Sequence, residues 1–73
     1  MPELPRISGK EAIRAFERLG FRQVRQRGSH VVLRRDAKGC VVPLHKSLSA
    51  GTLKSAIRQA GVTVEEFSHA HKS

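Results

Sequence analysis

Residues 8–20 have the hydrophobic pattern of an amphipathic helix. The apolar stripe recurs at helical spacing and consists of Ala12, Ile13, Phe16 and Leu19. Ser8 and Glu11 have the spacing of a capping box, in which each side chain accepts a hydrogen bond from the backbone N–H of the other residue. Gly20 is typical of the position just past a helix end, since glycine readily adopts a positive φ. We expect a helix over this range, with its stripe in the core.

Residues 21–44 have the pattern of short strands separated by turns. The strands are expected over residues 21–26, 30–35 and 40–44, with turns at 27–28 and 36–39. Phe21 and Val24 are the expected core contributors of the first strand, which is otherwise polar. Gly28 supplies the positive φ that a hairpin turn needs, and Pro43 favours a strand end or a sheet edge. The three strands are expected to pair as an antiparallel meander.

Residues 49–60 predict a second helix, with Ser49 as its N-cap and a glycine directly after it. Its apolar stripe consists of Leu53, Ala56, Ile57 and Ala60. Another capping box at residues 63–66 opens one further turn, anchored by Phe67. Residues 68–73 are expected to form a frayed polar tail.

The order of these elements predicts an α+β fold. The economical arrangement has two layers in the order αβββα, with a three-stranded antiparallel sheet and both helices on one of its faces. The opposite face is then free for solvent or a ligand. Double-stranded RNA-binding domains share this element order, but the likeness is an analogy of fold and proves no function.

The positive charge of the chain is concentrated in its middle. The 73 residues carry a formal net charge of +8, and residues 21–46 hold seven basic side chains and one acidic side chain. The segments before and after this range each carry a net charge of only +1. A localised basic surface is typical of nucleic-acid binders. Charge for solubility, or a surface for an acidic protein, is the alternative.

Composition excludes several classes of protein. There is no apolar run long enough to span a membrane and no apolar signal-peptide core, so we expect no membrane association and no export. The single Cys40 fits a reducing, cytoplasmic compartment and is better interpreted as an ordinary strand residue than as a nucleophile. His69 and His71 form a His-x-His pair without a third ligand nearby, so we expect no metal and no cofactor.

His30 is the leading candidate for chemistry. Histidine is the side chain most easily poised to move a proton near neutral pH, and arginine holds phosphate through charge-assisted hydrogen bonds. Arg25, Arg27 and Arg34 lie close to His30 in the sequence. RNA can be cut without a metal, because its own 2′-hydroxyl is the nucleophile and the enzyme supplies a base, an acid and positive charge. The alternative is an ordinary strand histidine. Three consecutive apolar residues, 31–33, hide the alternation of inward and outward side chains, so the pattern does not determine on which face of the sheet His30 lies.

Three further residues are candidates for RNA binding. His45 follows the third strand and is a second proton carrier, a phosphate ligand or an exposed loop histidine. Ser29 orients His30, contacts phosphate or serves only the turn. Lys46 lies before the second helix, where a phosphate would also meet the helix dipole. Since there is no Trp or Tyr and the three Phe residues occupy core-like positions, the chain favours backbone recognition over base stacking.

Several motifs resemble one family. In chain order they are Ile7–Glu11, Leu19-Gly20-Phe21, Arg27-Gly28-Ser29-His30, Val42–Lys46, Gly51–Ile57 and Gln59-Ala60-Gly61. Each motif alone is short, but their order and spacing are similar to those of the HicA toxins of bacterial HicAB toxin–antitoxin systems. The resemblance extends from about Ile7 to Phe67, and implies a single HicA-like domain over residues 1–73 with an ordered part at about 7–67.

The resemblance implies a double-stranded RNA-binding-like fold and mRNA interferase activity, with His30 as the catalytic residue. It also implies a HicB antitoxin as partner, which covers the active site and often binds operator DNA. The chain itself is then expected to contact operator DNA only indirectly, through the antitoxin. We therefore expect a metal-independent endoribonuclease that cleaves mRNA. The rival hypothesis is a non-catalytic RNA-binding module that inhibits translation by occupancy.

Overall fold

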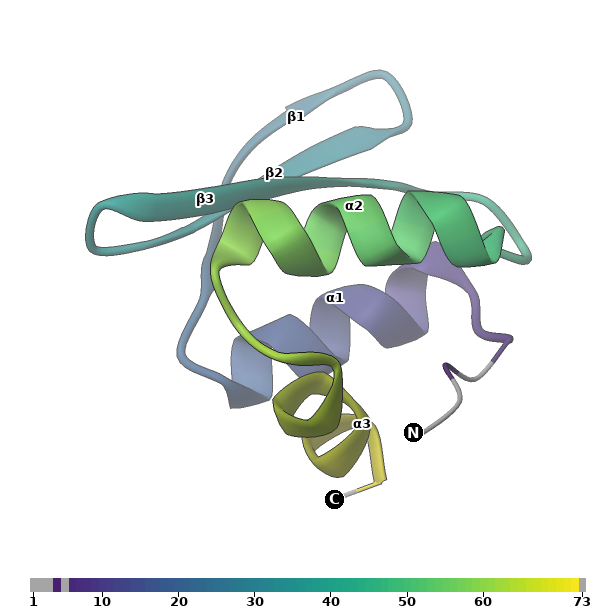
Figure 1. Ribbon diagram of the computed structural model, residues 1–73. Coiled ribbons are helices and arrows are strands. Elements are labelled where there is room, and N and C mark those ends of the chain that lie inside the picture. The colour runs from purple at the N-terminus through teal and green to yellow at the C-terminus, as the bar shows by residue number, and fades with distance from the viewer. Residues whose placement is uncertain (1–3, 5, 73) are drawn as a thin grey trace.

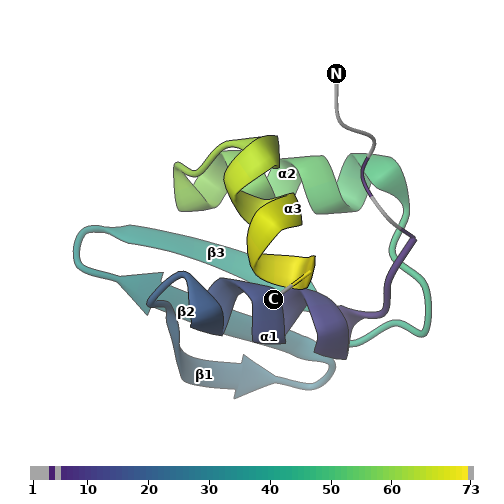
Figure 2. The same cartoon turned by 90° about the horizontal axis from the view of Figure 1, so that it is seen from below.

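The computed structural model describes residues 4 and 6–72, which form helices packed against one three-stranded sheet (Figure 1). The elements are α1 (Gly9–Arg18), β1 (Arg22–Arg27), β2 (His30–Arg35), β3 (Lys38–Pro43), α2 (Ala50–Ala60) and α3 (Val64–Lys72). The sheet order is β1-β2-β3 and both pairings are antiparallel. Figure 2 shows α1 and α2 on the same side of the sheet. The predicted α+β fold is confirmed, and α3 is added to its αβββα order.

Both ends of α1 are formed as predicted. The Ser8 hydroxyl accepts a hydrogen bond from the Glu11 backbone N–H, and the Glu11 carboxylate accepts one from the Ser8 backbone N–H, each at 3.1 Å. The hydrogen bonds from the backbone N–H and then the hydroxyl of Ser8 lower the pKa of the Glu11 carboxyl below its ordinary value. Gly20 has a φ of +97° just past the helix. These local contacts explain why the limits of α1 can be predicted from sequence.

α2 also begins and ends where the pattern places it. Ser49 is its N-cap, with its hydroxyl accepting from the Thr52 backbone N–H at 3.2 Å, and Gly61 ends it with a φ of +74°. The capping box before α3 is formed too, because Thr63 and Glu66 exchange hydrogen bonds of 2.8 and 3.0 Å.

The predicted polar tail is wrong for residues 68–72, which continue α3. Phe67 is fully buried, with its ring centroid 5.0 Å from that of Phe16 on α1, and Ala70 is 5% exposed. The Arg18 guanidinium donates to the backbone carbonyl of Ala70 at 3.0 Å, which satisfies an acceptor near the C-terminal end of α3. Packing on α1 thus stabilises a helix that has little apolar pattern of its own. Ser73, the last residue of that predicted tail, lies outside the described residues.

The two hairpin turns are each two residues long. The first is Gly28-Ser29, with a φ of +58° at Gly28, and the second is Asp36-Ala37, with a φ of +53° at Asp36. Such turns need positive φ, which glycine adopts freely and aspartate tolerates. The first turn therefore lies one residue later than predicted, and β3 begins at Lys38 rather than at Cys40.

The prediction that Val24 contributes to the core is wrong. A β-bulge interrupts the β1–β2 register between Gln23 and Arg25, and Val24 is 52% exposed. Val24 is the extra residue of the bulge, so it has no partner on β2 that would align it with the core. Phe21, which precedes β1, is buried at 2% exposure as predicted, with its ring centroid 5.6 Å from that of Phe16.

The hydrophobic core lies between the sheet and the helices. The sheet residues that face it are Val31, Leu33, Cys40 and Val42, each at most 2% exposed. Both predicted helix stripes join the same cluster, with Leu19 only partly buried. Among the helices of the described residues, none has the length and apolar character that a membrane crossing requires.

Candidate nucleic-acid interface

The strand register decides the face on which His30 lies. From the first turn inwards, the cross-strand rows on this face are Arg27–His30–Pro43, Arg25–Val32–Val41 and Arg22–Arg34–Gly39. Directly opposite residues share a face of a sheet, and successive residues alternate. Since Val31 and Leu33 are buried against the helices, His30, Val32 and Arg34 point the other way. The sheet residues in these rows are called the outer face below.

The outer face brings together four of the candidate residues. His30, Arg25, Arg27 and Arg34 are all exposed, and Arg27 lies directly opposite His30 in the register. Within residues 4 and 6–72, no hydrogen bond or ion pair engages any of these four side chains. An imidazole and several guanidinium groups are therefore open to a ligand on one surface. The arrangement can supply a proton acceptor and positive charge to a phosphodiester.

Arg35 has a different position from its neighbour Arg34. Its guanidinium donates to the Leu19 backbone carbonyl at 2.6 Å and lies 4.8 Å from the centre of the Phe21 ring. It thereby satisfies a carbonyl at the C-terminal end of α1. Adjacent arginines of one strand thus have different surroundings, and sequence position alone does not distinguish them.

Three backbone hydrogen bonds hold the end of the sheet where His30 begins β2. Leu44 N–H donates to the Ser29 carbonyl at 2.7 Å, Gly9 N–H to the His45 carbonyl at 2.9 Å, and Leu48 N–H to the Ile7 carbonyl at 2.8 Å. They join the first turn, the start of α1 and the connector after β3. A Cβ atom at position 9 would collide with the Pro43 carbonyl oxygen, so glycine is needed for this close approach.

The same hydrogen bonds also place the remaining candidate residues at this end of the sheet. Ser29 lies in the turn directly before His30, and His45 and Lys46 follow Leu44, whose backbone N–H donates to the Ser29 carbonyl. All three are exposed. A hollow of about 210 Å³ lies beside His45 and Lys46, and its lining residues are Ser8, Lys10, Leu44, His45 and Lys46. Basic groups from α1 and from the connector thus extend the positive surface around this end.

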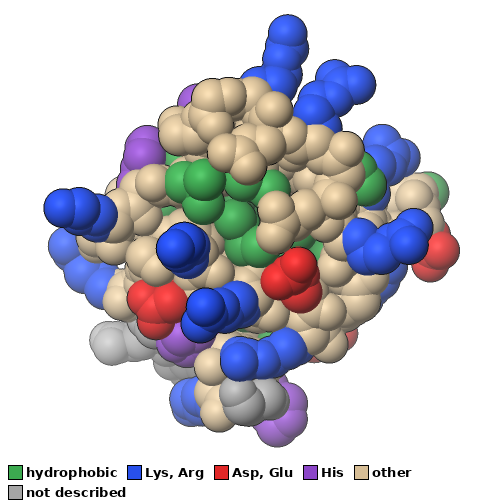
Figure 3. Space-filling model, turned by 180° about the vertical axis from the view of Figure 1, so that it is seen from behind, with side chains coloured by type: hydrophobic (Ala, Val, Ile, Leu, Met, Phe, Trp, Pro, Cys, Tyr) green, Lys and Arg blue, Asp and Glu red, His purple; other side chains and the backbone are tan. Residues whose placement is uncertain are grey.

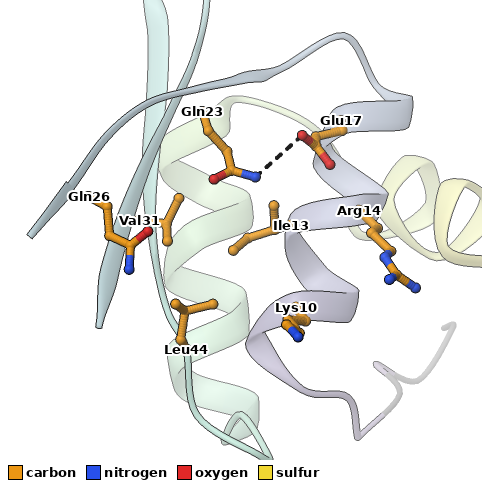
Figure 4. Close-up of a pocket in the computed structure, with 8 residues that line it drawn as sticks. All are labelled: Lys10, Ile13, Arg14, Glu17, Gln23, Gln26, Val31 and Leu44. Atoms are coloured by element: carbon orange, nitrogen blue, oxygen red, sulfur yellow. Dashed lines mark hydrogen bonds between the residues drawn. The ribbon is translucent and has the colours of Figure 1, made fainter. Parts of the chain in front are cut away.

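A second hollow, of about 290 Å³, lies between α1 and β1 (Figure 4). Its lining residues are Lys10, Ile13, Arg14, Glu17, Gln23, Gln26, Val31 and Leu44. Gln23 donates to the Glu17 carboxylate at 3.5 Å across it. In Figure 3, which views the side opposite to that of Figure 1, hydrophobic side chains are bordered by Lys, Arg and acidic side chains. Sequence reasoning did not find this hollow, because its residues come from four separate segments of the chain.

The other candidate chemistry of the sequence lies away from the outer face. Cys40 is buried on the opposite face of β3, and burial raises the pKa of its thiol to about 12. His69 and His71 are on α3, and His71 lines a small hollow with Glu11, Arg14 and Arg18. The part of the chain that the structure describes contains no group of three or more His, Cys, Asp or Glu side chains placed to hold a metal ion.

The chain matches the model of a known protein family. The family model described as HicA toxin of bacterial toxin–antitoxin matches residues 9–62, which is more than half of the chain. The matched range runs from the first residue of α1 to just past α2 and includes the whole sheet; α3 lies beyond it. No curated protein sequence matches the chain.

Proposed function

Because this chain belongs to the HicA toxin family, whose members are toxins of bacterial toxin–antitoxin systems, we propose that it is a metal-independent endoribonuclease that cleaves mRNA. In this proposal His30 is the general acid or base, and a HicB antitoxin neutralises the toxin. The observation that carries the proposal is the outer face. It presents an exposed, unbonded imidazole on the same surface as Arg25, Arg27 and Arg34.

The proposed reaction uses the nucleophile that RNA itself contains. A base removes the proton of a 2′-hydroxyl, its oxygen attacks the adjacent phosphorus, and the 5′-oxygen leaves with a proton from an acid. The products are a 2′,3′-cyclic phosphate and a 5′-hydroxyl, so atoms and charge balance. Neutral His30 would accept the first proton. Arg25, Arg27 and Arg34 would hold the phosphate and stabilise the charge that develops on its oxygens.

The second proton carrier is proposed to be His45. It follows Leu44, whose N–H bonds to the Ser29 carbonyl, so its place in the fold is at the same sheet end as His30. Ser29 and Lys46 are also exposed there and would contact RNA. Replacement of His45 by Ala should therefore slow cleavage without abolishing RNA binding.

Cleavage of a long mRNA in EDTA tests the proposal. Wild-type protein should produce fragments, and His30→Ala should lose roughly 10²–10⁴ of the rate, which is the usual contribution of a general acid or base. Because His30 is exposed and unbonded, its loss should leave the melting temperature close to that of the wild type. His69→Ala, which removes another exposed imidazole on α3, is the matched control and should keep full activity.

Two outcomes would contradict the proposal. Full activity of folded His30→Ala would remove His30 from the reaction. Salt-sensitive binding of RNA by the wild type without any fragments would favour the occupancy hypothesis, in which the same basic face blocks translation without catalysis.

A further inference from the structure

The two edges of the sheet are protected to different degrees. β3 forms one edge, and α2 packs along it (Figure 1). The Val41 backbone N–H, which has no partner on β2, donates to the Gln59 side-chain oxygen of α2 at 3.1 Å. Pro43 has no N–H to offer. Covering helices, bonded side chains and proline are the usual means by which proteins block an edge strand.

β1 forms the other edge, and within the described residues no helix packs along it as α2 does along β3. All six of its residues are exposed, and Figure 2 shows it at the edge of the sheet away from α2. Arg27 and His30 flank a two-residue turn and so form the first hydrogen-bonded pair. By alternation, the N–H and C=O of Gln26 point away from β2, toward solvent. An unpaired edge is a template for a further strand, and the β-bulge at Val24 confines the regular part of this edge to Arg25–Arg27.

The surroundings of β1 indicate what such a strand would contain. On the outer face, Arg22, Arg25 and Arg27 line the edge. On the helix side, the hollow between α1 and β1 has apolar walls from Ile13, Val31 and Leu44 (Figure 4), and its polar lining includes Lys10 and the Glu17 carboxylate. Side chains of a strand alternate between the two faces. Acidic residues would therefore meet the arginines, and apolar residues between them would face the hollow.

We propose that the free edge of β1 binds an extended, acidic segment of a protein partner by β-strand addition. The partner is taken to be the antitoxin, and in that respect the inference rests on the proposed function. The segment would alternate acidic and apolar residues, and its backbone would pair with Gln26. Such binding would also place a protein chain beside the rows that contain His30 and Arg25. Inhibition would then follow from occupancy of the outer face next to the edge.

Two other occupants fit the edge less well. A second copy would bring the arginines of its own β1 opposite those of the first, and like charges directly opposite are destabilising. RNA offers phosphate acceptors to the N–H groups, but its donors, such as the 2′-hydroxyls, do not alternate with these acceptors at the spacing of the N–H and carbonyl groups along the edge. A polypeptide strand satisfies both.

Amide hydrogen exchange by NMR tests the inference on the full chain. The probe is a short synthetic peptide of alternating glutamate and valine, added to ¹⁵N-labelled wild-type protein at low salt. We expect exchange at the Gln26 N–H to slow on binding, while exchange at the Val41 N–H, already bonded to Gln59, stays unchanged. Gln26→Pro removes the outward donor and should weaken peptide binding by roughly fivefold or more, the effect of one lost hydrogen bond. Gln26→Ala keeps the N–H and should bind within about twofold of the wild type.

The controls separate this inference from the proposed nuclease. Equal binding of polyglutamate and of the alternating peptide, with no slowing at Gln26, would reduce the edge to a basic surface and overturn the inference. If single-stranded RNA slowed exchange at the Gln26 N–H, the edge would be assigned to RNA. If exchange slowed in the protein alone as it dimerises, the edge would be assigned to a second copy. RNA cleavage is measured without peptide, so active protein whose edge fails to bind contradicts only the inference. Edge binding by protein that cuts no RNA contradicts only the nuclease.

Discussion

The two faces of β2 have very different compositions. Toward the helices lie Val31 and Leu33, at 1% and 0% exposure, and on the opposite face lie His30 and Arg34, both exposed. The inner residues belong to the core, whereas the side chains of the outer residues make no hydrogen bond or ion pair within the described part of the chain. Alternate residues of one strand therefore separate folding from the proposed chemistry. Changes on the inner face should act on stability, and changes on the outer face on RNA.

The largest effect on stability should come from substitution of Leu33. Leu33→Ala leaves a cavity in the core and should lower the free energy of unfolding by about 2–5 kcal/mol, a large share of the stability of a small domain. Val32→Ala, one residue away and half-buried on the outer face, should cost about 1 kcal/mol or less. Urea denaturation followed by circular dichroism measures both. If Leu33→Ala does not fold, Leu33→Val provides a milder cavity, at about 1 kcal/mol. Equal costs at the two positions would contradict the division of faces.

Sequence reasoning predicted the helices well because their ends are decided locally. The capping boxes at Ser8 and Thr63 involve residues three apart, and their hydrogen bonds form as the spacing indicates. The meander follows in the same way from short turns between β-prone segments. None of this required knowledge of distant contacts.

What sequence reasoning could not predict depends on contacts between distant segments. The bulge at Val24 is an adjustment between two paired strands, and it has no mark in the sequence of β1. The last turns of α3 form because Arg18, 52 residues away from Ala70, satisfies its carbonyl. The face of His30 was hidden by three consecutive apolar residues, and only the pairing with β1 and β3 reveals it. The candidate site was therefore predicted as a set of residues but not as a surface.

The next largest effect should be the difference in reaction rate between a thiol on the inner face and a thiol on the outer face. With a pKa of about 12, Cys40 is almost entirely the neutral thiol at pH 9, whereas an exposed thiol at its ordinary value of 9.0 is half ionised. Because the thiolate is the nucleophile, native Cys40 should react with iodoacetamide at least about 100-fold more slowly than an exposed cysteine. The preference for the neutral thiol stabilises the fold fully below pH 9, and this contribution is lost as the pH rises toward 12.

The matched variant moves the thiol by one residue. Val41 is 39% exposed on the outer face, so Cys40→Ala/Val41→Cys should react rapidly in the folded protein. Mass spectrometry of samples quenched over time gives both rates, and urea-unfolded wild type provides the reference. Rapid labelling of native Cys40 would mean that the inner face opens readily to solvent.

The smallest effects should distinguish Arg34 from Arg35. Arg34→Gln removes one exposed charge from the outer face, and should lower the slope of log affinity for single-stranded RNA against log salt by about 0.7 if that charge contacts a phosphate. Its stability should stay within about 0.5 kcal/mol of the wild type. Arg35→Gln should leave the salt slope unchanged and lower the free energy of unfolding by about 1–3 kcal/mol, because it removes the charged hydrogen bond to the Leu19 carbonyl and the contact with the Phe21 ring. Fluorescence anisotropy over a salt series and urea denaturation give the two readouts for each variant. If both variants lowered the salt slope equally, RNA would extend beyond the outer face to the sheet end beside α1, and the division between a folding face and a binding face would not hold for these arginines.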